Sequence, residues 1–169
     1  MNYEQKMQLE KDRIKLSIKS MYFNRYLLVR YVTALFFFTN FYWMVSLGMS
    51  NSPFVYLPLG LMAIIVISVA EQVKIYSSHT NNAKFTRFCY QAMLVANILL
   101  IIPTCLSSSF AQLYPFFVND IKSKVFVLSV LVAGILLSVL MLHRLNQIKQ
   151  NKDKQYQRIK EYEKAVKFK

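Results

Sequence analysis

The stretch YLLVRYVTALFFFTNFYWMVSL, Tyr26–Leu47, decides the fold class of this chain of 169 residues. A helix needs about 17–25 predominantly apolar residues to cross a bilayer, and this stretch falls within that range. Its apolar residues would cover every side of a helix, whereas a helix on the surface of a soluble protein has a single apolar stripe. We therefore interpret the stretch as a membrane span, and not as a core helix of a soluble bundle.

Three further runs have the same character and comparable length. They are Phe54–Tyr76, Phe88–Leu106 and Val125–Leu142. A hydrophobic fraction of 55% with only 3 Gly is too apolar for an ordinary soluble domain. The sequence predicts an all-α integral membrane protein, a four-helix bundle over residues 26–142. A cytosolic basic segment, 1–25, precedes the bundle, and a basic helical tail, 143–169, follows it.

The distribution of charge predicts the orientation of the spans. Lys and Arg number 21 against 8 Asp and Glu, a formal net charge of +13. Most of these cations precede the first run or follow the fourth, and Lys84 and Arg87 lie in the loop between the second and third runs. Lys122 and Lys124, near the fourth run, are the exception. Since cytoplasmic loops carry the excess of Lys and Arg, both termini are expected in the cytosol.

The first 25 residues contain no Gly or Pro and have the pattern of an amphipathic helix. The apolar side of that helix would be formed by Tyr3, Met7, Ile14, Ile18 and Met21. The lysines fall mostly on other sides, a pattern typical of segments that lie on anionic phospholipid. Anionic phospholipid is therefore a predicted partner of this segment.

The tail is predicted to continue the fourth span as one long helix. Apolar residues at a and d heptad positions are Leu145, Ile148, Ile159, Tyr162 and Val166, with Lys152 and Gln155 as polar exceptions. Such a seam fits pairing with a second copy or with the amino-terminal helix. A solvated helix resting on lipid headgroups is an equal alternative. Membrane phospholipid is the nearer polyanion for a basic tail, so nucleic acid is not expected as a partner.

Glu71 interrupts the second run before its hydrophobicity ends, and Arg30 interrupts the first. At the helical rise both would lie about 6–8 Å inside the same boundary, on antiparallel neighbours. Charges at such depth usually face a partner. We expect Glu71 to be the counter-ion of Arg30, in a polar layer with Gln91 and His143. This layer fits either a structural clamp or a functional site.

Polar residues also occur deeper in the predicted spans. Asn40 and Asn97 are expected to find partners, commonly across a helix interface. Pro103 is expected to kink the third span and to free a carbonyl that Thr104 or a neighbour could satisfy. The fourth run contains small residues that favour close helix approach: Ser129, Ala133, Gly134 and Ser138.

The sequence contains no HExxH, GxSxG, P-loop or CxxC motif, and its histidines are His79 and His143. We expect no enzyme, metal or cofactor. The leading hypothesis is a non-enzymatic subunit or modulator of a larger transport or envelope assembly, which binds other membrane proteins or itself. The alternative is a small oligomeric transporter or channel with an ion- or proton-linked layer at Arg30, Glu71 and His143. The Lys-rich usage, 15 Lys against 6 Arg, and the absence of an Asn-x-Ser/Thr glycosylation site fit a bacterial plasma membrane.

Overall fold

The computed structural model describes the backbone of residues 3–78 and 81–167, and the side chains of 3–75 and 81–166. All regular structure in these ranges is helical. The long helices are α2 (Leu27–Met49), α3 (Tyr56–Ser78), α4 (Lys84–Cys105) and α6 (Ile121–Lys149). Four apolar segments on them are long enough to cross a membrane, so the prediction of an all-α protein with four candidate spans is confirmed.

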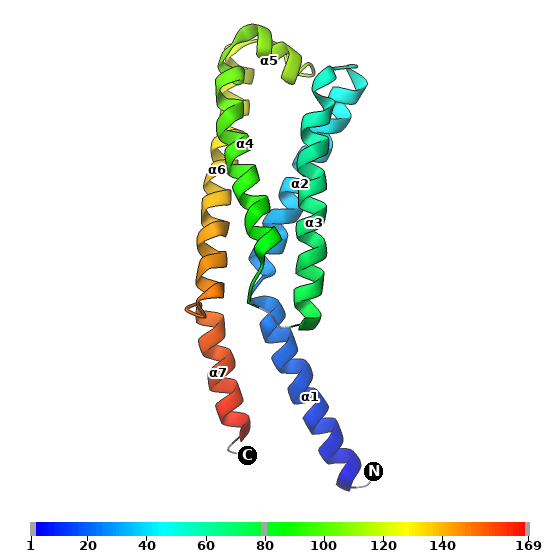
Figure 1. Cartoon of the computed structure of the whole chain (residues 1–169), viewed down its shortest axis with the longest axis vertical. Coiled ribbons are helices and arrows are strands. Elements are labelled where there is room, and N and C mark those ends of the chain that lie inside the picture. The colour runs from blue at the N-terminus through cyan, green and yellow to red at the C-terminus, as the bar shows by residue number, and fades with distance from the viewer. Residues whose placement is uncertain (1–2, 79–80, 168–169) are drawn as a thin grey trace.

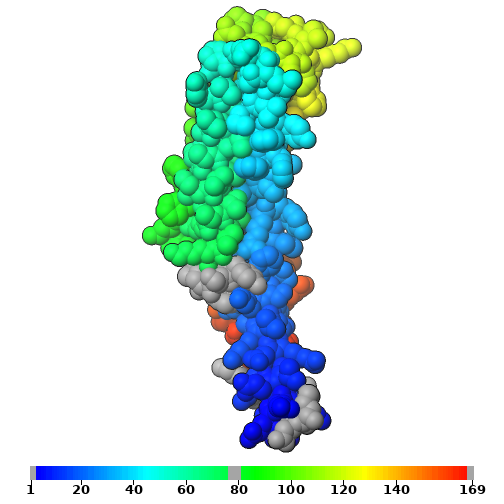
Figure 2. Space-filling model, turned by 90° about the vertical axis from the view of Figure 1, so that its right-hand side faces the viewer, coloured from blue at the N-terminus to red at the C-terminus, as the bar shows by residue number. Residues whose placement is uncertain are grey.

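Two further helices extend beyond one end of the bundle (Figure 1). They are α1 (Tyr3–Asn24) and α7 (Lys154–Lys167), and we call this pair the stalk. Both ends of the chain lie at this stalk end, whereas the short helix α5 (Ser107–Leu113) lies at the far end (Figure 1). The space-filling view shows the stalk as a narrow continuation of the broader bundle (Figure 2).

Helix α1 forms where the sequence predicted a helix. It runs along the long axis of the molecule, close to the direction of α2, and packs against α7 (Figure 1). Ile159 of α7 is fully buried, which places the predicted apolar seam of the tail between helices of the same chain. The sequence left two partners open for the tail helix, a second copy of the chain or the amino-terminal helix. In this structure the tail helix α7 packs against the amino-terminal helix α1.

The prediction of one continuous helix through the tail is wrong, because the chain breaks between α6 and α7. Asn151 has a left-handed backbone with φ of 55°. The amide of Asn151 donates to Ile148 O at 3.1 Å, and the amide of Lys152 donates to Gln147 O at 3.0 Å. This pair of bonds is a Schellman motif, which satisfies the last carbonyls of α6 and ends the helix. Asn is one of the few residues that adopt this backbone readily.

The four long helices leave most of their apolar surface facing outward. Only 17–28% of each apolar window is buried inside the protein, as expected where lipid covers the remainder. Helices α4 and α6 pack closely, and Gly134 of α6 lies directly against Asn97 of α4. Ser138 is fully buried, so two of the predicted small residues lie inside the bundle. Helices α2 and α6 meet at few points.

The far end has its own small core beneath α5. Phe110 and Leu113 of α5 pack with Tyr114 against residues of α4 and α6. Trp43 of α2 donates its indole N–H to Leu113 O at 2.9 Å and stacks on the Tyr114 ring, with centroids 5.7 Å apart. These contacts connect α2 to the segment that joins α4 and α6.

Candidate functional site

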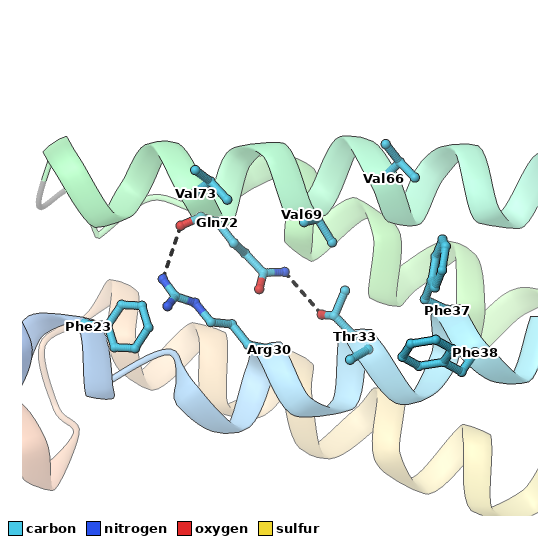
Figure 3. Close-up of a pocket in the computed structure, with 10 residues that line it drawn as sticks. Phe23, Arg30, Thr33, Phe37, Phe38, Val66, Val69, Gln72 and Val73 are labelled. Carbon is cyan, nitrogen blue, oxygen red and sulfur yellow. Dashed lines mark hydrogen bonds between the residues drawn. The ribbon is translucent and has the colours of Figure 1, made fainter.

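Arg30 lies at one end of a groove of about 550 Å³ between α2 and α3 (Figure 3). Its guanidinium donates from Nη2 to Gln72 O at 3.3 Å, and its carbon Cζ lies 3.7 Å from the centroid of the Phe23 ring. Apolar side chains such as Phe37 and Val69 line the rest of the groove (Figure 3). The Arg30 side chain is thus held by a backbone carbonyl and by an aromatic face.

The expected ion pair between Arg30 and Glu71 is not what the structure shows. The Glu71 carboxylate instead caps the start of α4. Oε1 accepts from the amide of Phe85 at 3.1 Å, and Oε2 accepts from the amide and hydroxyl of Thr86 at 2.7 Å and 2.8 Å. Successive residues on a helix point about 100° apart, so Gln72 faces α2 while Glu71 faces α4. The shared depth of Arg30 and Glu71 does not bring them together.

The Glu71 cap supplies what α4 lacks locally. The first turn of α4 contains no acidic residue, and Ala83 at its N-cap offers no side-chain acceptor. The first four N–H groups of a helix have no partner within the helix, and its N-terminus has a partial positive charge. A carboxylate from α3 satisfies two of these amides and places a negative charge at that terminus. Glu71 therefore joins α3 to α4.

A chain of polar side chains crosses the stalk-end half of the bundle. Gln72 Nε2 donates to Thr33 Oγ1 at 3.2 Å and to Ser68 Oγ at 3.1 Å. Thr33 Oγ1 lies 2.8 Å from the hydroxyl of Tyr90, which donates to Val29 O at 2.8 Å. Gln72, Thr33, Ser68 and Tyr90 are all buried. These bonds connect α2, α3 and α4, and the sequence analysis did not anticipate them.

Gln91 and His143 do not join Arg30 and Glu71. Both are exposed. Gln91 lines a recess of about 150 Å³ near Asn81, and His143 Nε2 lies 3.0 Å from Gln147 Nε2 on the same helix. His79 lies outside the described residues. Within the described ranges, no three His, Cys, Asp or Glu side chains converge as a metal site would require.

The three deeper polar residues have different surroundings. Asn40 is buried, and its Nδ2 donates to Phe36 O at 2.8 Å. Thr104 is buried and donates to Leu100 O at 2.6 Å, one residue after Pro103. Asn97 lines a groove of about 520 Å³ between α2 and α6, and Asn40 lines the same groove. Asn40 is thus bonded within its own helix, not across an interface, whereas Thr104 also hydrogen-bonds to the Tyr114 side chain beyond α5.

The most extensive polar cluster is at the junction between bundle and stalk. Arg25, in the turn between α1 and α2, is 1% exposed. Its Nε donates to Asp153 Oδ2 at 3.1 Å, and its Nη2 donates to Asp153 Oδ1 at 2.6 Å. The guanidinium also donates to the side chains of Asn81 and Asn151, both at 3.0 Å, and to Ile148 O at 3.2 Å. We call these five residues the Arg25 junction.

The Arg25 junction connects three separate turns of the chain. Asp153 precedes α7 and accepts from the Tyr156 amide at 3.2 Å, so one carboxylate binds both Arg25 and the start of α7. Asn81, before α4, donates to Asn151 at 2.8 Å. A buried arginine is tolerated only when its donors are paired in this way. The direction of the stalk relative to the bundle is therefore fixed by hydrogen bonds.

Aromatic rings complete the junction. The Arg25 guanidinium lies 4.9 Å from the centroid of the Tyr156 ring and 5.8 Å from that of Tyr22. Burial, followed by the nearby charge of Glu163, raises the pKa of the Tyr22 phenol. The phenol thus remains neutral at physiological pH, and a neutral ring attracts the cation through its face.

We found no protein family, curated protein or solved structure that matches this chain.

Proposed function

We propose that this protein is a non-enzymatic subunit or modulator of a larger membrane assembly, and that its stalk binds the partner. The observation that carries the proposal is the Arg25 junction. Burying an arginine and an aspartate has a large desolvation penalty, which good geometry only offsets. Such a cluster adds little to stability compared with apolar packing, but it specifies one direction for the two stalk helices. A defined direction matters when the stalk has to meet a partner.

The surface of the stalk supports binding to an acidic partner. Together α1 and α7 contain ten Lys and Arg against five Asp and Glu. Leu9 and Leu16, seven residues apart on one side of α1, are 48% and 66% exposed. Apolar side chains amid cations on a rigid helix pair suit a partner that offers acidic and apolar side chains together.

The positive-inside rule indicates on which side of the membrane the stalk lies. The cations of the stalk favour placing both termini in the cytosol, with the four spans in a plasma membrane. The same cations would attract anionic phospholipid wherever the stalk approaches the headgroups. The transporter alternative is weaker, because Arg30, Glu71 and His143 do not converge on one cavity.

Photo-crosslinking from the stalk tests the proposal. A photoreactive amino acid at Leu16 is expected to give a discrete protein adduct in cells. The same adduct should weaken when Asp153→Asn is added, since the stalk is then no longer held in one direction. The partner identified by mass spectrometry should also co-purify with the wild type in mild detergent. Adducts with lipid alone would contradict a protein partner and would instead place α1 on the membrane surface.

A further inference from the structure

The groove between α2 and α6 has the size and composition of a small-molecule site. Its volume of about 520 Å³ falls within the roughly 300–1,000 Å³ that is typical of ligand pockets. Three small residues are among those that line it: Ala96, Ala133 and Gly134. Aromatic side chains, Trp43 and Phe126 among them, line the part nearest the far end. No Lys, Arg, Asp or Glu is among its described lining residues.

Among the described residues, Asn97 contributes an unpaired carboxamide to this groove. The Asn97 carboxamide makes no hydrogen bond to any described part of the chain. The groove's other carboxamide and its two aliphatic hydroxyls donate to their own helix. Asn40 donates to Phe36 O, Thr39 to Leu35 O and Ser46 to Tyr42 O, each at 2.8 Å.

The Asn97 carboxamide occupies a position that the packing has left for it. A Cβ atom on Gly134 would lie 2.8 Å from Asn97 Nδ2 and 3.2 Å from Oδ1, so any larger residue there would require the amide to move. Asn97 is the fourteenth residue of the 22-residue helix α4, well away from either end. A polar group at that depth cannot find water and needs a hydrogen-bonding partner.

The geometry narrows what that partner can be. The acyl tails of ordinary phospholipids fill apolar space, but at this depth they offer no hydrogen-bonding group. The groove's volume of about 520 Å³ is close to that of a single turn of a helix 10–12 Å wide, so it suits a small molecule better than a partner helix. The absence of charged lining side chains disfavours an ionic ligand. We infer that the groove binds an uncharged lipid whose hydroxyl or carbonyl group hydrogen-bonds to Asn97.

Trp43 provides an internal probe of this site, because it is the sole tryptophan of the chain and lines the groove. The probes are a bromine-labelled long-chain alcohol and the matching bromine-labelled alkane, added to the full chain in detergent micelles. Bromine in contact with an indole quenches its fluorescence. The alcohol should reach half-maximal quenching at about one tenth of the alkane concentration, which corresponds to one hydrogen bond of about 1.4 kcal/mol.

Variants separate this inference from simple filling of the groove. In Asn97→Leu, the alcohol and the alkane should reach half-maximal quenching at the same concentration. Asn97→Ala should give the same result, and its smaller side chain checks that the loss is not due to leucine filling the groove. Thr39→Val is the matched control, because its hydroxyl is already bonded within α2, and it should keep the tenfold preference. Unchanged Trp43 emission without probe checks that each variant is folded. Equal quenching by the two probes in the wild type, or a preference that survives both Asn97 changes, would overturn the inference.

Discussion

Replacing Asp153 by asparagine removes the counter-ion of a buried arginine and leaves the helix cap in place. Asn and Asp are equally good N-cap residues, so the bond to the Tyr156 amide should survive. The Arg25 guanidinium would keep its contacts with Asn81, Asn151 and Ile148 O, but it would be a buried cation without a carboxylate. The expected effect is local, an undocking of α7 from the junction.

The size of the effect follows from the burial of the pair. The side chains of Arg25 and Asp153 are both 0% exposed, so solvent screening is negligible. Breaking a buried pair costs about 3–5 kcal/mol, and the asparagine oxygen that remains an acceptor places this variant near 3 kcal/mol. That figure corresponds to a rise of roughly a hundredfold in the population of the undocked state.

Hydrogen exchange measured by mass spectrometry in detergent or nanodiscs reports this opening directly. Peptides from α7 should exchange roughly a hundredfold faster in Asp153→Asn, while peptides from the centre of α4 should be unchanged. Asp120→Asn is a matched control, since Asp120 caps α6 through a bond to the Ile121 amide and the structure shows no arginine bonded to it. Equal exchange of α7 in the wild type and Asp153→Asn would refute the role of the buried charge.

Three further outcomes are expected. Glu71→Ala should lower the free energy of unfolding by about 1–2 kcal/mol, because α4 loses its cap. In thermal unfolding this loss should add to the loss caused by Arg30→Met. A double variant more stable than the sum of the two losses would show that the two charges pair after all. Gly134→Leu should destabilise the α4–α6 contact by about 1–3 kcal/mol, whereas Gly60→Leu should cost nothing comparable, because a Cβ at Gly60 meets no atom within 4 Å; equal melting temperatures would contradict this packing. A Ser52→Cys variant should react with a membrane-impermeant thiol reagent from outside the cell, and labelling only from inside would reverse the predicted orientation.

Hydrophobic run length was sufficient to predict the class of the fold. Each of the four runs became a helix, because hydrocarbon requires every backbone group to bond within its own segment. The break before α7 was missed, although Asn151 and Asp153 are suitable as a left-handed C-terminal residue and an N-cap. The heptad pattern runs through both residues, and it therefore predicted one continuous helix there.

The site residues were harder to predict, for a geometric reason. Depth in the membrane follows from counting residues, and it placed Arg30 and Glu71 near each other. The direction of a side chain around its helix depends on how neighbouring helices pack, and here it turned Glu71 toward Thr86 of α4. Arg25 appeared to be one more cation at the boundary. Its burial depends on Asp153, 128 residues away, and local sequence carries no signal of that contact.

The central claim is that the Arg25 junction holds the stalk in one direction. A distance measurement between spin labels at two exposed stalk positions, Lys11 of α1 and Lys164 of α7, tests it most directly. The measurement would use nanodiscs and a background in which Cys89 and Cys105 are replaced by serine. A single narrow distance distribution in the otherwise unchanged protein, broadened by Asp153→Asn, is the predicted result. A broad distribution before any change at the junction would contradict the claim, because two helices that move independently cannot form a fixed docking surface.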